Sequence, residues 1–294
     1  LADFGSSQRL ADRGEQAGPD DDRGIVNLLG EQIEFADVIV VSKSDLADAD
    51  TLANTKAVLR GLNRDARIVE SRNGDLPLSE ILDTKRFDYV RAQLAPGWMK
   101  ELRGEHTPET EEYGIASFVF RARRPFHPLR LGQLLARGID SVIRSKGFFW
   151  LATRMDWVGE LSTVGGATQT QAAGFWFAAR HRVDANQVGE PPAAVERSLA
   201  PLTDQGWTRL EAARWSAPPP APAEVPDPRE YAAMQRLWNP IWGDRRQELA
   251  VIGVGLDEAQ ARAELERCLL TDEELALGPD AWRELPDPFP AWRR

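Results

Sequence analysis

The chain has 294 residues, with 46 acidic and 36 basic side chains and a formal net charge of −10 at pH 7. That length predicts two domains, and the negative charge argues against a protein that binds nucleic acid through its phosphates. Apolar residues make up 42% of the chain, which is enough for a folded core without disulfides. The single cysteine, Cys268, excludes an internal disulfide and predicts a reducing, cytoplasmic compartment.

Hydrophobic periodicity in the first hundred residues predicts a parallel α/β sheet. Helical spacing of apolar residues at 25–33 and 52–62 alternates with short apolar runs at 38–41 and 66–69, and a further helix is expected around 78–82. Helices that alternate with strands are typical of a parallel sheet with helical crossovers. The run at 38–41 is apolar on both faces, so we expect a strand that is buried on both sides.

The composition changes after residue 96, because all ten tryptophans lie at or beyond Trp98. We expect domain boundaries that give a first domain at 1–96, a linker at 97–111, a smaller α+β domain at 112–275 and a tail at 276–294. Within the second domain we expect strands at 115–121, 148–153, 175–179 and 248–254, helices at 128–142 and 257–269 with Asp257 as the N-cap, and a proline-rich insertion at 217–228. No stretch is apolar enough to predict a membrane span.

A polar loop, Ser42-Lys43-Ser44-Asp45, directly follows the apolar run at 38–41. Open parallel sheets bind ligands at the carboxyl ends of their strands, so the position favours a binding site. An ordinary strand-to-helix loop is the alternative. The loop resembles the Asn-Lys-x-Asp loop with which P-loop GTPases bind guanine, and Ser42 stands where those proteins have asparagine.

Longer stretches at 28–46, 104–131, 142–154 and 245–275 resemble the CobW-like GTPases, a family of metal chaperones and cobalamin-synthesis proteins. The resemblance implies the C-terminal part of a P-loop GTPase sheet followed by the family's C-terminal domain. It also implies GTP and Mg²⁺ as ligands, with Ser42, Lys43 and Asp45 at the guanine base. It further implies zinc as cargo and a client metalloprotein as the partner of the C-terminal domain.

Two motifs of that family are absent from these 294 residues. The sequence contains no Gly-x-x-x-x-Gly-Lys-[Ser/Thr] and no Cys-x-Cys-Cys, so we assign no catalytic residue and no metal ligand. Without a backbone cradle for the phosphates, GTP hydrolysis by this chain alone should be negligible. We expect the natural polypeptide to extend upstream of Leu1, and the alternative is a degenerate copy whose N-terminal remnant is poorly ordered. The rival hypothesis is a nucleotide-independent protein-interaction module derived from the same family.

Four further groups of side chains have competing interpretations. The histidines His106, His127 and His181 are too dispersed to predict a zinc site, and His127 suits a surface or capping position. The basic patch of Arg121, Arg123, Arg124 and Arg130 either receives an acidic partner or phosphate, or is a solvated strand end paired with Glu109, Glu111 and Glu112. The aromatic residues at 148–150, 157 and 175–177 form either a docking face or, as we favour, a core. We expect Cys268 to be a buried apolar residue. The oligomeric state is left open.

Overall fold

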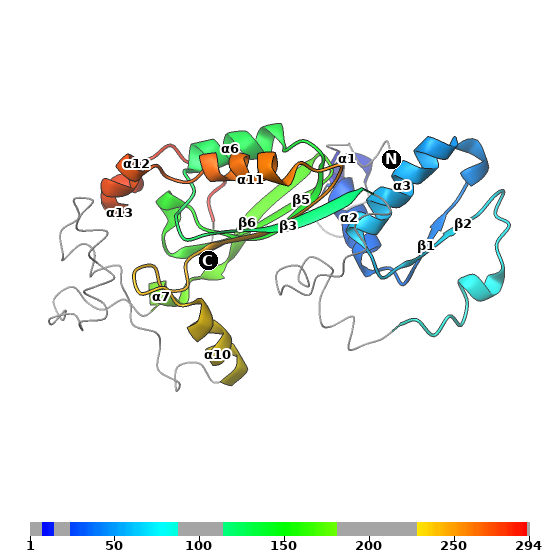
Figure 1. Ribbon diagram of the computed structural model, residues 1–294, viewed down its shortest axis with the longest axis horizontal. Helices are drawn as coiled ribbons and strands as arrows, with labels where there is room; N and C mark the ends of the chain where they lie inside the picture. The colour runs from blue at the N-terminus through cyan, green and yellow to red at the C-terminus, as the bar shows by residue number, and fades with distance from the viewer. Residues whose placement is uncertain (1–7, 15–23, 88–113, 181–227, 293–294) are drawn as a thin grey trace.

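The computed structural model describes residues 8–14, 24–87, 114–180 and 228–292. The N-terminal unit comprises α1 (Leu10–Arg13), α2 (Ile25–Phe35), β1 (Val38–Val41), α3 (Ala49–Leu62) and β2 (Arg67–Glu70). Strands β1 and β2 pair in parallel, with Val38 opposite Arg67. The predicted alternation of helix and strand is therefore confirmed (Figure 1).

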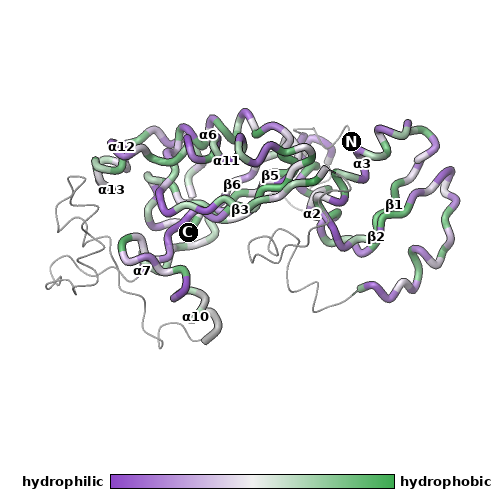
Figure 2. The backbone as a smooth tube through the Cα atoms, viewed as in Figure 1, coloured by the Kyte–Doolittle hydropathy of each residue, from purple (hydrophilic) through white to green (hydrophobic). Residues whose placement is uncertain are grey.

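Strand β1 is apolar, as Figure 2 shows, but the prediction that it is buried on both faces was wrong. Val40 is 38% exposed, and β2 is the only strand that pairs with β1 among the described residues. The prediction of a helix around 78–82 was also wrong. A single 3-10 turn, Leu78–Glu80, forms instead, with Leu78 exposed and Asp83 soon after it at a positive φ that a right-handed helix cannot contain.

The C-terminal unit is built on a five-stranded antiparallel sheet in the order β3-β7-β4-β5-β6. Its strands are β3 (Ile115–Ala122), β4 (Val142–Phe149), β5 (Trp157–Val164), β6 (Ala167–Phe175) and β7 (Gln247–Val254). Strands β4, β5 and β6 form a meander, and β7 inserts between β3 and β4. The α+β character predicted for this part of the chain is confirmed.

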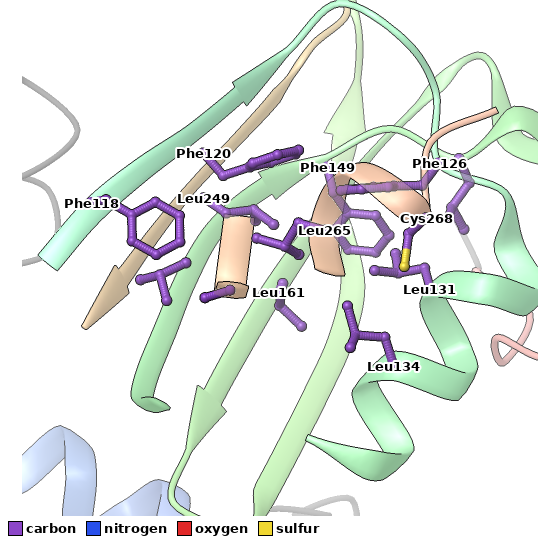
Figure 3. Close-up of a cluster of buried hydrophobic side chains, with 13 residues drawn as sticks. Phe118, Phe120, Phe126, Leu131, Leu134, Phe149, Leu161, Leu249, Leu265 and Cys268 are labelled. Atoms are coloured by element: carbon purple, nitrogen blue, oxygen red, sulfur yellow. The ribbon is translucent and has the colours of Figure 1, made fainter. Parts of the chain in front are cut away.

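One face of this sheet is covered by α6 (Pro128–Arg137) and α11 (Glu258–Arg267) (Figure 1). Side chains from both helices meet those of the strands in a buried cluster that includes Phe118, Phe120, Phe126, Leu131, Leu134, Phe149, Leu161, Leu249, Leu265 and Cys268 (Figure 3). The predicted N-cap of α11 is confirmed, since the Asp257 carboxylate accepts the Gln260 N–H at 3.0 Å.

Several boundaries in this unit differ from the sequence predictions. Helix α6 ends at Arg137 because Gly138 has a φ of 81°, and residue 142 already begins β4. The strand expected at 148–153 is the end of β4, followed by a 3-10 turn. The strand expected at 175–179 is the end of β6 followed by α7 (Phe177–Arg180). Strand β5 and most of β6 were missed, because their many Thr, Ser and Gln residues give little apolar alternation.

Helices α2 and α3 of the N-terminal unit cover part of the opposite face of the same sheet. A Cβ added at Gly30 of α2 would lie 2.8 Å from Val164, and one added at Gly61 of α3 would lie 2.6 Å from Ile143, so both glycines permit close approach. Glu34 and Arg144 join the two units by an ion pair whose side chains are 3% and 1% exposed. The two units are therefore packed together through side chains.

The remaining helices lie at the end of the sheet away from the N-terminal unit (Figure 1). They are α10 (Pro228–Leu237), α12 (Asp272–Ala276) and α13 (Gly278–Trp282), and a second buried cluster contains Trp150, Trp176, Trp242 and Trp282. The expected linker and most of the proline-rich insertion lie outside the described residues. The division into 1–96, 97–111, 112–275 and 276–294 therefore stays a prediction.

Candidate functional site

The loop Ser42–Asp45 leaves the carboxyl end of β1, as expected from the sequence. Lys43 has a φ of 57°, in the left-handed region, and a short 3-10 turn, Ser44–Leu46, begins directly after it. Ser44 is buried, whereas Ser42, Lys43 and Asp45 are exposed. The backbone reversal at Lys43 thus turns one serine inward as an anchor and leaves three polar side chains accessible.

A second loop, which follows β2, holds the first one in place. The Ser44 N–H and the Ser44 hydroxyl both donate to the Ser71 carbonyl at 3.2 Å, and the Ser71 N–H donates to the Val41 carbonyl at 2.9 Å. The Asn73 N–H lies 3.4 Å from Asp45 Oδ1, a long hydrogen bond. Sequence reasoning missed Ser71 and Asn73. The available signal was that their loop follows the next strand, whose carboxyl end lies at the same edge of a parallel sheet.

The chemistry of this site suits a flat ligand that has adjacent N–H donors. The Asp45 carboxylate has capacity for further donors beyond the long bond from Asn73. The aliphatic stem of Lys43 can cover an apolar ring surface while its ammonium stays in water. Ser42 adds a hydroxyl that can donate or accept. We find no group of three or more His, Cys, Asp or Glu side chains in the described part of the chain that could hold a metal ion.

The basic patch is engaged by other parts of the C-terminal unit. Arg121 pairs with Glu248, Arg124 with Asp272, Arg130 with Glu274, and Arg123 donates to the carbonyls of Leu237, Gly243 and Arg245. The expected partners Glu109, Glu111 and Glu112 lie outside the described residues. Pairing with those three glutamates therefore stays a prediction, whereas the contacts within the described residues already engage all four arginines with carboxylates or carbonyls.

His127 occupies the N-cap position of α6, but its side chain is 11% exposed and makes no capping bond. Burial and the charge of Arg130 lower its pKa, and Glu274 partly offsets them. Burial raises the pKa of the neighbouring Cys268 thiol to about 11, as suits the inert buried residue that we expected. His106 and His181 lie outside the described residues.

The aromatic residues predicted to form a core do so in large part. Phe149, Trp150 and Trp176 are at most 3% exposed, and Trp150 packs against Trp242 with ring centroids 5.3 Å apart and ring planes tilted by 59°. Trp157 and Phe175 are only partly buried and pair with each other across the β5–β6 ladder, with centroids at 4.2 Å. A docking face on this cluster is therefore restricted to its outer members.

Together these features define a class of protein in which a parallel-sheet unit with a polar loop at its carboxyl edge is joined to an α+β domain. The chain belongs to the CobW family. Residues 115–269, more than half of the chain, match the model of the "Cobalamin synthesis protein cobW C-terminal domain". Residues 10–70 match the "CobW/HypB/UreG, nucleotide-binding domain".

Two curated relatives align over most of the chain. "Zinc-regulated GTPase metalloprotein activator 1" of Dictyostelium discoideum is 35% identical over 98% of this chain and 53% of its own length. A zinc chaperone of Mycobacterium tuberculosis is 29% identical over 92% of this chain and 56% of its own length. The chain thus spans about half the length of the curated relatives that it matches.

Among solved structures, the zinc-bound YjiA GTPase from E. coli matches 83% of this chain and 55% of its own, at 15% identity and a TM-score of 0.31. This likeness is too distant to carry an argument about the site. No helix in the described ranges is both long and apolar enough to cross a membrane.

Proposed function

We propose that this chain is part of a GTP-dependent metal chaperone that carries zinc and delivers it to client metalloproteins. Membership of the CobW family and the names of the two relatives support this proposal. The observation that carries it is the loop Ser42–Asp45, which presents a carboxylate and a lysine at the carboxyl edge of β1. The C-terminal unit would contact the client, and the protein would work in the cytoplasm.

In this proposal Asp45 accepts hydrogen bonds from the guanine amino group and ring N–H, and the stem of Lys43 lies along the base. GTP with Mg²⁺ supplies the phosphoryl-transfer chemistry when bound. The residues of this chain select the base and hold it. Ser44, anchored on Ser71, fixes the height of the loop above the sheet, so that Asp45 meets the edge of the base. We assign no residue of this chain to the binding of the phosphate groups or of zinc.

The substitution Asp45→Asn tests whether the Asp45 carboxylate recognises guanine. Guanine has two adjacent N–H donors, the ring N–H and the amino group, and the Asp45 carboxylate can accept a hydrogen bond from each. Xanthine has a carbonyl in place of the amino group. Asp45→Asn should weaken GDP binding by about tenfold or more, since hydrogen bonds to a charged group contribute about 1.5–3 kcal/mol. The same variant should gain affinity for xanthosine diphosphate, because its amide can donate to the new carbonyl. Isothermal titration with GDP, xanthosine diphosphate and ADP measures all three.

The matched control is Asp50→Asn, which removes the same charge from an exposed position in the first turn of α3. It should leave GDP affinity unchanged. Equal binding of ADP and GDP by the unmodified chain would contradict guanine recognition. Absence of any response to nucleotide would favour the rival interaction module, for which Ser42 in place of asparagine marks the loss of base recognition.

A further inference from the structure

Strand β6 is an edge strand whose composition lacks the usual protection. It lies at the end of the five-stranded sheet, and its ladder partner in the described structure is β5 alone. Its nine residues, Ala167–Phe175, include no charged residue and no proline. An outer strand presents a row of backbone N–H and C=O groups, and natural proteins usually block pairing there with charge, proline or a bulge.

The regular part of β6 is long enough to accept another strand. Residues 167–172 pair with β5 without interruption, and the register shifts only beyond them, near Val158 and Gly159 of β5. Thr168, Gln171 and Ala173 are exposed. The outer edge is therefore straight over its polar first two thirds and distorted only at its end.

We propose that β6 pairs antiparallel with β6 of a second copy of this chain, which joins two five-stranded sheets into one. Charge favours a second copy at this strand. The chain carries a net charge of −10, so two copies repel each other overall, whereas β6 itself brings no like charges together. The strand is also chemically self-complementary, because threonine and glutamine side chains can each donate and accept.

Symmetry then limits the register to pairings that set one residue of β6 opposite its own copy, and the proposal places Thr170 at that centre. A two-fold axis perpendicular to the sheet keeps the helices α6 and α11 of both copies on one side, and it requires facing residues to point to the same side. Centred on Thr170, this pairing sets Thr170 opposite Thr170 and Gln169 opposite Gln171. Thr170 lies beside Leu161, on the face covered by helices, and Gln171 lies beside Glu160 on the other face. Opposed threonine pairs are among the favourable cross-strand pairs.

A different surface could also drive self-association, and the test must separate the two. Exposed apolar side chains gather in the N-terminal unit, at Phe35, Val40, Leu46, Leu78, Ile81, Leu82 and Phe87. Association through these apolar side chains would not predict which residue faces which across the interface. The β6 pairing, by contrast, predicts which residue meets its own copy.

Two substitutions, one in the strand and one outside it, test the proposal on the full chain. Thr170→Lys places two ammonium groups face to face across the axis and should weaken dimerisation at least tenfold in sedimentation equilibrium. Gln133→Lys, on an exposed position of α6, adds the same charge and should leave the dimer unchanged. A chain that is monomeric at all concentrations, or a dimer that both variants weaken equally, overturns the proposal.

Thr170→Cys tests the register of the β6 pairing directly. Its readout is the formation of a cross-link and not the loss of a dimer. Facing residues of an antiparallel pair have Cα atoms about 4.5–5.5 Å apart, within the range of a disulfide. Oxidised glutathione should therefore join the two introduced thiols in one intermolecular disulfide, while Thr168→Cys, four residues out of register with its own copy, should remain largely reduced. The native Cys268 is buried and does not interfere. Equal cross-linking of the two variants, or of neither, overturns the β6 interface.

Discussion

Glu274 shows how one carboxylate can serve two neighbouring structures. It accepts the Thr271 N–H at 2.8 Å in the capping box of α12, and it accepts two hydrogen bonds from the Arg130 guanidinium at 2.5 and 2.7 Å. The hydrogen bonds from Arg130 lower the pKa of Glu274 from 4.5 to about 2. A depressed folded-state pKa stabilises the protein above pH 4.5, and that contribution is lost as the pH falls towards 2.

Replacement of Glu274 should therefore change how the free energy of unfolding depends on pH in the acid range. Glu274→Gln retains a side chain that can complete the capping box but removes the charge opposite Arg130. We expect a loss of about 2 kcal/mol at pH 7, which shrinks as the pH falls from 4.5 to 2. Urea denaturation at several pH values measures this difference.

The control is Glu266→Gln, which neutralises an exposed carboxylate on α11. Its stability difference should stay within about 0.5 kcal/mol at every pH. A constant difference for Glu274→Gln across the acid range would mean that Arg130 does not hold the carboxylate ionised.

At the scale of elements, the buried pair of Glu34 and Arg144 joins α2 to β4. Arg144 donates to Glu34 at 2.5 and 3.1 Å, and it also donates to the Ser162 hydroxyl and the Thr163 carbonyl. The buried guanidinium is thus satisfied by groups from both units. Helix α2 runs directly into β1 and its polar loop, so this pair holds the helix that precedes the candidate site on the C-terminal sheet.

Removal of one partner should cost far more than removal of both. Glu34→Ala or Arg144→Ala leaves an unpaired buried charge and should lower the unfolding free energy by about 3–5 kcal/mol. The joint replacement Glu34→Leu with Arg144→Met should cost less than either single change, because no buried charge remains. Urea denaturation measures these differences, and Glu34→Gln provides a milder variant if the alanine variants do not fold.

The partly exposed pair of Glu258 and Arg262, one turn apart on α11, is the matched control, and its cycle separates the ion pair from the contact of Arg262 with the Phe118 ring. Its double-mutant cycle should give a coupling below about 0.5 kcal/mol. A similarly small coupling between Glu34 and Arg144 would contradict tight packing of the two units.

The pair of Glu34 and Arg144 also affects the design of deletion variants. A chain that starts at residue 97 lacks α2 and α3 and exposes Arg144, so partner binding has to be tested on the whole chain.

The sequence predicted those elements whose local signals agree. Helix α11 has both an Asp257 cap and helical spacing, and β1 and β7 are apolar runs of strand length. Strand β5 and most of β6 were missed because threonine and glutamine are tolerated in them by ladder pairing, which is not a local property. The loop Ser42–Asp45 was found because it follows a strand. Its support by Ser71 was not, because parallel pairing brings that residue from 27 positions away.

At the scale of the whole molecule, the end of the chain returns to its middle. Residues 285–292, which we call the C-terminal strap, are held by Arg154, which donates to both oxygens of the Asp287 carboxylate at 2.8 and 2.9 Å. Trp292 then packs on Phe149, with ring centroids 5.8 Å apart, and under the Arg154 guanidinium at 4.4 Å. The family's C-terminal model ends at residue 269, so the strap covers the sheet from beyond it.

Loss of the Trp292 ring should therefore weaken the whole C-terminal unit. The ring covers Phe149 and reaches within 2.8 Å of a Cβ placed at Gly159, so Trp292→Ala would open a void above the β4–β5 ladder. We expect a loss of about 2–3 kcal/mol in urea denaturation, somewhat below the value for a fully buried tryptophan. Leu277→Ala removes an apolar side chain that is 66% exposed between α12 and α13 and should change stability by less than about 0.5 kcal/mol. Equal effects of the two substitutions would show that the strap rests on the sheet without stabilising it.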